Sequence, residues 1–251
     1  LQELLAMGGN AYRCSHNAPA EELLELCDEY GILVMDETRR FDTGEIGLKE
    51  LSYLVRRDRC HPSIILWSIG NEEPLQGEDR GFRIAAEMRR IIRELDDTRP
   101  VTMAMHNGFY QKGAGDAVDV IGVNYNHEDY DKIRARYPDK PFVASEIFNL
   151  ADGVYENGNP YNGTDGALAT LKAIAERPYI AGSFGWAGEE YRGEHRNLGF
   201  FTDCCPLSCI GERKDAFYHY QAVWTEQPMI HICGHWNHKD GELCRVKVFS
   251  N

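Results

Sequence analysis

The chain has 251 residues, of which 43% are hydrophobic, and it carries a formal net charge of −13. This length and apolar content suffice for one large domain with a buried core, such as an α/β barrel. The acidic balance argues against nucleic acid or an anionic membrane as the main partner, and no apolar run of about 18 residues predicts a membrane-spanning helix.

Short β-rich runs alternate with helical patterns in the first half of the chain. The 20–31 segment places its apolar residues on one helical face, and Gly31 predicts its end. In chain order the pattern predicts a strand at 10–15, a helix at 20–31, a strand at 32–37, a helix at 48–59, a strand at 64–72, a helix at 81–96 and a strand at 100–108.

The alternation continues in the second half. It predicts strands at 120–126, 141–147 and 180–188, and helices at 130–137, 165–177 and 214–224. Most of the strands are continuous apolar runs, which indicates a parallel sheet covered by helices on both faces. Repeated βα units predict a (β/α)8 barrel or a doubly wound sheet, and the absence of a GxGxxG or Walker pattern disfavours the second.

Seven βα units are one fewer than a complete barrel contains. The chain opens LQELLAMGGN, without an initiator methionine or a signal-like core, so it reads as the middle of a longer protein. We therefore expect an α/β fold, a (β/α)8 TIM barrel lacking strand 1, over residues 1–226. The opening leaves the compartment undecided between bacterial cytoplasm and the periplasm or secretion.

The pattern changes after Trp224. Residues 229–250 alternate polar and apolar side chains around the turn sequence KDGE, which predicts a β-hairpin. We expect residues 227–251 to begin a β-sandwich-like accessory domain.

The eight cysteines show no framework spacing, so reduced thiols are expected. CCPLSC at 204–209 lacks a paired CxxC, which disfavours a metal site there. In HICGHWNH (231–238), a strand would bring His231, Cys233 and His235 to one face, with His238 beyond. A metal cluster is geometrically open, but structural pairing of the strand is favoured, so no metal is predicted.

Polar side chains follow each predicted strand. Because barrel enzymes carry their chemistry at the C-terminal ends of the strands, these residues are the candidates for a site. They are Arg13 and His16, Asp36 and Glu37, Asn71, Glu72 and Glu73, His106 and Asn107, Tyr125 and Asn126, Glu146, and Trp186.

Two carboxylates on opposing strands are the minimum for hydrolysis of a glycosidic bond. One protonates the leaving oxygen, while the other attacks the anomeric carbon or activates water. Glu72 and Glu146 end strands that lie across a barrel mouth, where carboxyl groups about 5 Å apart would give a retaining mechanism. Trp186 offers an apolar face for a sugar ring.

Six sequence blocks occur together in order, namely RCSHNAPAEELLELCDEYGILVMDE, LVRRDRCHPSIILWSIGNEE, VIGVNY, ASE, SFGWAG and YHYQAVWTEQPMIHI. In these blocks the chain resembles family 2 glycoside hydrolases, and within them bacterial β-galactosidases. The resemblance covers nearly the whole chain, and it implies a retaining exo-β-glycosidase, most of all a β-galactosidase.

The resemblance also implies roles for single residues. Glu72 resembles the general acid/base and Glu146 the nucleophile. Asn71 resembles the amide that binds the sugar 2-hydroxyl, and Tyr125 the tyrosine that hydrogen-bonds the nucleophile. The resemblance extends to the pair Arg13 and His16, which buttress the nucleophile, and to Trp186, which forms the platform of a subsite.

The sequence departs from family members that need magnesium, because Phe41 and Thr43 stand where those members carry an acid and a histidine. We therefore expect neither a metal nor a cofactor. The region where glucuronidases carry an Asn-x-Lys element shows none, which favours a neutral hexoside. The resemblance further implies upstream jelly-roll and Ig-like domains in the full-length protein, and it leaves an oligomer open.

Alternatives remain for several residues and for the function. Glu73 is favoured as a solvated or ion-paired loop residue and Asp36 as a structural one, whereas Glu37 and His106 could either line the pocket or support it. A β-glucuronidase or β-mannosidase of the same family is the first alternative function. A carbohydrate-binding homologue without turnover is the second, and the presence of both glutamates speaks against it.

Overall fold

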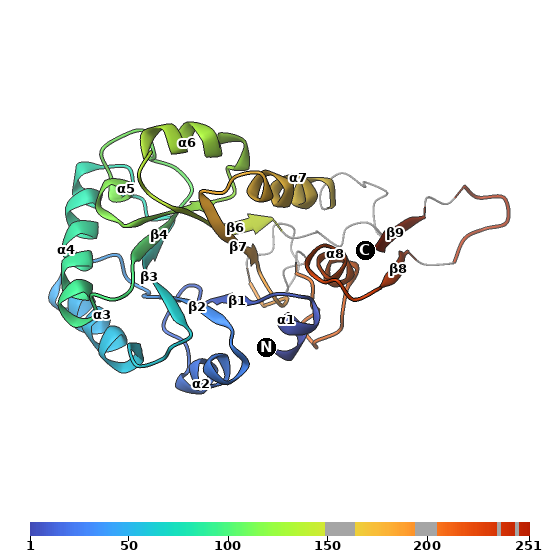
Figure 1. Ribbon diagram of the computed structural model, residues 1–251, viewed down its shortest axis with the longest axis horizontal. Coiled ribbons are helices and arrows are strands. Elements are labelled where there is room, and N and C mark those ends of the chain that lie inside the picture. Colours follow the sequence, from blue (N-terminus) through green and yellow to red (C-terminus); the bar gives the residue numbers. More distant parts are fainter. Residues whose placement is uncertain (149–163, 194–204, 235–236, 244–245) are drawn as a thin grey trace. The chain divides into compact units, whose positions relative to one another are not determined.

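The computed structural model describes residues 1–148, 164–193, 205–234, 237–243 and 246–251. Seven strands form one sheet in which each strand neighbours the next along the chain (Figure 1). They are β1 (Ala11–Arg13), β2 (Leu33–Glu37), β3 (Ile64–Asn71), β4 (Val101–Met105), β5 (Val120–Asn124), β6 (Phe142–Phe148) and β7 (Ile180–Trp186). The order is that of a TIM barrel with one strand fewer than eight, so the predicted fold class is confirmed.

Helices separate the strands as predicted, with shifts at their ends. They are α1 (Gln2–Ala6), α2 (Glu21–Tyr30), α3 (Glu45–Asp58), α4 (Asp79–Leu95), α5 (Ala114–Ala117), α6 (Tyr130–Arg136), α7 (Thr164–Ala175) and α8 (Asp215–Trp224), with a 3-10 turn at His127–Asp129. Within the described ranges, none of these helices combines the length and the apolar character that crossing a bilayer requires.

The described chain divides into two compact units. One contains residues 10–146 and 173–184, which include β1 to β5 and most of β6 and β7. We call it the barrel unit. The other contains residues 1–9, 147–172 and 185–251, and we call it the terminal unit.

In the barrel unit, helices α2 to α6 lie outside the strands (Figure 1). The apolar residues of the strands are buried and form the core. Buried side chains from β2, β3, β5 and β6 form one cluster, and the partly buried Phe184 of β7 packs against it; the buried members are Met35, Leu66, Val120 and Val143. Adjacent pairs from β1 to β6 are parallel, which explains why their sequences are almost continuously apolar.

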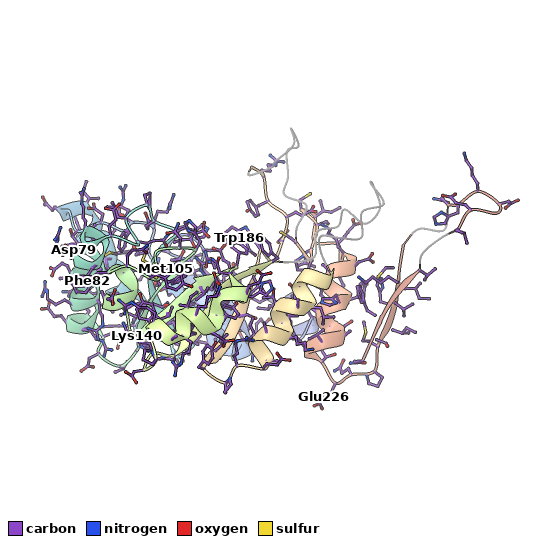
Figure 2. All side chains as sticks on the ribbon, turned by 90° about the horizontal axis from the view of Figure 1, so that it is seen from above. Asp79, Phe82, Met105, Lys140, Trp186 and Glu226 are labelled. Atoms are coloured by element: carbon purple, nitrogen blue, oxygen red, sulfur yellow. The ribbon has the colours of Figure 1, made fainter. Side chains whose placement is uncertain are left out.

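In the barrel unit, hydrogen bonds from one lysine join the loop before β6 to the end of α5. Lys140, labelled in Figure 2, donates from Nζ to the carbonyl oxygens of Gly115, Asp116 and Val118 at 2.7, 3.1 and 2.6 Å. These carbonyls lie at the C-terminal end of α5, where a helix leaves backbone acceptors without intrahelical partners. The ammonium of Lys140 satisfies these acceptors. The Lys140 tether thereby fixes the chain just before β6.

In the terminal unit, β8 (Ile230–Cys233) and β9 (Lys247–Ser250) pair antiparallel, which confirms the predicted hairpin. The hairpin packs on α8 through aromatic rings. Tyr218 stacks on His231 with centroids 3.8 Å apart, and His219 meets Phe249 edge-on at 5.1 Å. Burial lowers the pKa of His219 to about 4, so this histidine is a neutral core residue near pH 7.

Candidate active site

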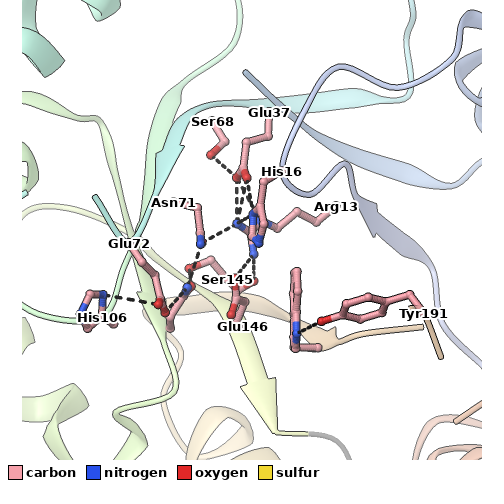
Figure 3. A network of polar contacts seen from close by, with 12 residues as sticks. Arg13, His16, Glu37, Ser68, Asn71, Glu72, His106, Ser145, Glu146 and Tyr191 are labelled. Carbon is pink, nitrogen blue, oxygen red and sulfur yellow. Dashed lines mark hydrogen bonds and ion pairs between the residues drawn. The ribbon is translucent and has the colours of Figure 1, made fainter. Parts of the chain in front are cut away.

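Arg13, the last residue of β1, is almost fully buried and holds two acidic side chains from other strands. Its Nε and Nη2 donate to Glu37 at 3.0 and 2.9 Å, and its Nη1 donates to Oε1 of Glu146 at 2.6 Å. Glu37 ends β2 and Glu146 lies in β6. Because parallel strands end on one side of a sheet, these residues meet at the C-terminal end of the strands (Figure 3).

Glu37 has no exposed surface, so its charge depends on its partners. Besides Arg13, its carboxylate accepts the hydroxyl of Ser68 at 2.7 Å and lies 2.9 Å from Nδ1 of His16. Nδ1 of His16 also lies 3.3 Å from Nη2 of Arg13. Glu37 thus contacts other protein side chains, and these contacts hold Arg13 and His16 in position.

Asn124, the last residue of β5, joins Asn71 to Glu72. Its Nδ2 donates to Oδ1 of Asn71 at 3.0 Å and to Oε1 of Glu72 at 2.9 Å. Its own Oδ1 accepts the hydroxyl of Ser145 at 2.7 Å, which fixes the orientation of the amide. Oδ1 of Asn71 also accepts Nη2 of Arg13 at 2.8 Å, so the contacts continue from Glu72 to Glu146.

Register explains why the two candidate carboxylates come close to the same residues. Asn124 is the direct partner of Glu146 in the β5–β6 pair, while its side chain reaches Glu72. Glu72 immediately follows β3, and its N–H donates to the carbonyl of Ala104 in β4 at 2.9 Å. The structure therefore brings Glu72 and Glu146 to the same end of the sheet, around one asparagine.

The two glutamates differ in exposure. The side chain of Glu146 is 5% exposed, whereas that of Glu72 is 33% exposed. His106 lies beside Glu72, with Nδ1 3.7 Å from Oε2. Gln76 holds this ring through a contact of 3.1 Å to the same nitrogen, so His106 is fixed at the open side of Glu72.

Three non-glycine residues at the ends of strands adopt a left-handed backbone conformation. Glu72 has φ of 51°, Tyr125 of 61° and Asn126 of 26°. Such values are sterically costly for residues with a Cβ and concentrate at functional sites. Contacts hold them in place, since the N–H of Tyr125 donates to the carbonyl of Glu146 at 2.7 Å and Nδ2 of Asn126 donates to that of His106 at 2.7 Å.

Trp186, which the sequence placed in the site, belongs to the terminal unit. There its Nε1 donates to the hydroxyl of Tyr191 at 3.1 Å, and the two rings meet edge-on with centroids 6.2 Å apart. The other candidates that the sequence singled out lie together in the barrel unit. They are Arg13, His16, Glu37, Asn71, Glu72, His106, Tyr125 and Glu146.

Two further acidic residues near this cluster, Glu73 and Asp36, have raised pKa values. Burial raises the pKa of Glu73, and the positive charge of Arg39 partly offsets the rise. Asp36 is fully buried on the other face of β2, where burial and the neighbouring Asp58 raise its pKa to about 8. Asp58 forms an ion pair with Arg57 at 2.5 Å. Asp36 therefore belongs to a structural group of charged residues on that other face of β2.

Sequence reasoning missed Asn124 and Ser145, although both lie in quoted blocks, VIGVNY and ASE. Each is a polar residue inside a buried apolar strand, with no exposed surface. A buried polar side chain needs hydrogen-bond partners, so its presence in such a strand is a signal that a network lies there.

Comparisons with known proteins agree on one family. The profile described as glycosyl hydrolases family 2, TIM barrel domain, matches residues 1–45 and 42–197. β-Galactosidase BoGH2A of Bacteroides ovatus is 31% identical, in an alignment covering 100% of this chain and 38% of that protein. A β-glucuronidase of Canis lupus familiaris is 26% identical, covering 84% of this chain and 36% of its own length.

A solved structure shows the same fold. The crystal structure of a β-glycosidase from Bacteroides vulgatus matches with a TM-score of 0.82 and 26% identity, covering 100% of this chain and 39% of that one. The chain thus spans less than half the length of each of these relatives.

Proposed function

The chain belongs to family 2 of the glycosyl hydrolases, and on that premise we propose that it acts as a retaining exo-β-glycosidase with β-galactosides as favoured substrates. The observation that carries the proposal is the chain of contacts from Glu146 through Arg13, Asn71 and Asn124 to Glu72. It joins a buried carboxylate to a partly exposed one at the end of a parallel sheet, as a pair of opposing catalytic carboxyls requires.

Glu146 is the proposed nucleophile. Arg13 binds its Oε1, which leaves Oε2 to form the bond to the anomeric carbon as the bond to the leaving oxygen breaks. Because Arg13 is itself held by Glu37, the attacking carboxylate has one orientation before substrate arrives.

Glu72 is the proposed general acid/base. Nδ2 of Asn124 donates to Oε1, so that oxygen accepts and the acid's proton must sit on Oε2, on the side of His106. Glu72 gives this proton to the leaving oxygen. In the second step it takes a proton from water, which attacks the anomeric carbon and releases Glu146, so the configuration is retained.

Asn71 is the proposed contact for the sugar 2-hydroxyl. Its Oδ1 accepts hydrogen bonds from Arg13 and Asn124, so its Nδ2 group is the part that remains to donate to a ligand. Hydrogen bonds to the 2-hydroxyl strengthen in the transition state, which is why a fixed amide at this position contributes to rate.

A β-galactoside is favoured over a β-glucuronide because the region where glucuronidases carry an Asn-x-Lys element shows none. The relatives do not separate the two substrates, since β-galactosidase BoGH2A and a putative β-glucuronidase of Formosa agariphila are each 31% identical over 100% of this chain. Arg13 does not offer a site for a substrate carboxylate, because its guanidinium already binds Glu37 and Glu146. A β-glucuronidase remains the second candidate, since named β-glucuronidases are among the relatives.

Turnover of nitrophenyl β-D-galactoside, β-D-glucuronide and β-D-mannoside separates these candidates. We expect the galactoside to give the highest kcat/KM. If it is the poorest of the three, the galactosidase assignment is wrong, while the glycosidase mechanism stands.

Glu146→Gln tests the mechanism itself. It keeps the shape of the side chain but removes the nucleophile, so we expect kcat to fall by about 10³-fold or more, with sugar affinity retained. Glu73→Gln, which changes a neighbouring acid outside the proposed pair, is the matched control. Unchanged turnover in Glu146→Gln would show that Glu146 is not the nucleophile, whereas sugar binding without turnover in the unmodified chain would favour the carbohydrate-binding alternative.

A further inference from the structure

Three side chains with metal-binding atoms meet in the terminal unit, between the start of α8 and strand β8. Asp215 is the first residue of α8, and His231 and Cys233 lie in β8. The two strand residues are two positions apart, so they share one face of the strand. A carboxylate oxygen, an imidazole nitrogen and the thiol sulfur all lie within 4.8 Å of one another.

The imidazole is held in one orientation. The ring stacks on Tyr218 with an interplanar angle of 9°, and its Nε2 lies 2.6 Å from Oδ1 of Asp215, a contact that an ion held by both residues would replace. Fixed ring orientation is what surrounding groups provide for metal-binding histidines. The thiol of Cys233 is buried, whereas the side chains of Asp215 and His231 are 17% and 24% exposed, so an ion can reach the group from solvent.

We propose that Asp215, His231 and Cys233 form a binding site for a divalent transition-metal ion, Zn²⁺ above all, with water completing the coordination. One nitrogen, one sulfur and one oxygen ligand suit Zn²⁺, whereas Mg²⁺ and Ca²⁺ require oxygen ligands. Tetrahedral coordination with bonds of about 2.0–2.3 Å places ligand atoms about 3.3–3.8 Å apart. The three atoms reach that spacing by movements of about 1 Å or less.

A cysteine beside a histidine also suggests a nucleophile, but the environment argues against one. Burial and the neighbouring Asp215 raise the pKa of Cys233 to about 12, although the positive charge of Lys247 acts in the other direction. The thiol is therefore protonated near neutral pH, whereas a nucleophilic cysteine needs a lowered pKa. A bound cation displaces that proton, as metals do when they bind thiols.

The site differs from the cluster that the sequence suggested. His238 lies 3.8 Å from Glu242, and His235 falls outside the described residues. Asp215 supplies the ligand that spacing within HICGHWNH could not reveal, because it precedes His231 by 16 positions. A metal here would fasten hairpin β8–β9 to α8, separately from the glutamates of the barrel unit.

Co²⁺ substituting for Zn²⁺ gives a direct test, because thiolate-bound Co²⁺ absorbs in the near ultraviolet and four-coordinate Co²⁺ absorbs in the visible range. We expect the full 251-residue chain, reduced and freed of metal, to bind one Co²⁺ with both bands, and Zn²⁺ to displace it. Cys233→Ser should lose the ultraviolet band, and Asp215→Asn and His231→Gln should each weaken Zn²⁺ binding by at least about tenfold.

Cys209→Ser is the matched control, because Cys209 is an exposed cysteine of the same unit. It should keep both bands and its Zn²⁺ affinity. The proposal is overturned if the unmodified chain shows no thiolate band, or if Cys209→Ser rather than Cys233→Ser abolishes it. The first of these outcomes needs no variant, so a variant that fails to fold does not remove the test.

Discussion

At the scale of single residues, the guanidinium of Arg13 is shared by two acids. It donates to Glu37 and Glu146, and the side chains of both are 5% exposed or less. The attraction within a buried ion pair is largely offset by the loss of water, but removing one partner leaves an uncompensated charge. Arg13 therefore contributes mainly to the orientation of these carboxylates.

Asn124 is expected to contribute to catalysis, although less than Glu146. Asn124→Ala removes the donor to Glu72 and Asn71 and leaves the hydroxyl of Ser145 without its acceptor. Because small misplacements of catalytic groups cost about 100-fold, we expect kcat/KM for nitrophenyl β-D-galactoside to fall by about that factor. Steady-state kinetics at saturating and limiting substrate measure the change.

Asn10→Ala is the control for Asn124→Ala, since Asn10 is an exposed asparagine of the same unit. Its kinetics and melting temperature should match those of the unmodified chain. Full activity in Asn124→Ala would show that the hydrogen bond to Glu72 has no catalytic role.

Asp36 is expected to weaken the fold as pH rises. Burial and Asp58 raise its pKa to about 8, from an unfolded value of about 3.9. Between these values the folded state holds a proton that the unfolded state has released, so the free energy of unfolding decreases with pH. When ionised, both carboxyl oxygens of Asp36 lack a donor, whereas a protonated Asp36 can share its proton with Asp58.

Asp36→Asn should therefore stabilise the chain at pH 9 by roughly 1–4 kcal/mol and change it little at pH 5. Urea unfolding at both values measures the difference, and Asp97→Asn, which changes an exposed acid, should show no such dependence. Equal destabilisation of Asp36→Asn at both values would mean that the ionised carboxylate is satisfied in the fold.

The residue-scale predictions from sequence were of two kinds. Polar residues that follow strands could be foreseen as neighbours, because parallel strands end together. Asn124 could not, since its contact depends on the β5–β6 register, which shifts between Gly122 and Asn124. No spacing rule shows such an irregularity, and only the folded sheet reveals which face the side chain takes.

At the scale of elements, Gly122 permits β4, β5 and β6 to approach closely. A Cβ at this position would lie 2.3 Å from the carbonyl oxygen of Met103 and 3.1 Å from the hydroxyl of Ser145. Because the obstructing oxygen belongs to the backbone, the strand itself must move. Gly122→Ala should destabilise the chain by about 1–3 kcal/mol, measured by denaturant unfolding.

Gly182 in β7 is the matched control, because a Cβ there meets nothing within 4 Å. Gly182→Ala should be neutral or slightly stabilising. If both variants unfold at the same denaturant concentration, the contact with Met103 does not limit the sheet.

Element boundaries were harder to predict than the elements. The apolar pattern of α3 begins at Leu48, yet the helix begins at Glu45, because Asp42 accepts the N–H of Gly44 at 2.9 Å and orders the approach. Helix α5 was not predicted, since its sequence AGDA carries no amphipathic pattern. Local hydrogen bonds and tertiary contacts, which leave little trace in periodicity, determine such short turns.

At the scale of the whole molecule, counting βα units predicted the sheet, and the resemblance to family 2 is confirmed. The boundary placed between residues 226 and 227 stays a prediction. The structure groups residues 1–9, 147–172 and 185–251 in one compact unit, which joins segments far apart in sequence. Strand periodicity reports on neighbours along the chain, so it cannot anticipate such a grouping.

The net charge of −13 gives a prediction for the molecule as a whole. Repulsion among surface carboxylates opposes compactness, and salt at about 0.1 M screens charges beyond about 10 Å. We expect the melting temperature at pH 7 to rise by a few degrees between low salt and about 0.15 M NaCl. Choline chloride at equal ionic strength should raise the melting temperature by the same amount as NaCl. A melting temperature that falls with either salt would show that attraction within exposed ion pairs outweighs the repulsion.

The left-handed conformations of Glu72, Tyr125 and Asn126 have a consequence for laboratory evolution. Glycine adopts such angles without penalty, so screening variants for heat resistance alone would enrich glycine at position 72 and discard the proposed proton donor along with the strain. Screening for turnover would restore the glutamate each time. Codon 72 would therefore encode glycine after screening for heat resistance and glutamate after screening for turnover. The residue found there would show which of the two selections a population of variants has passed through.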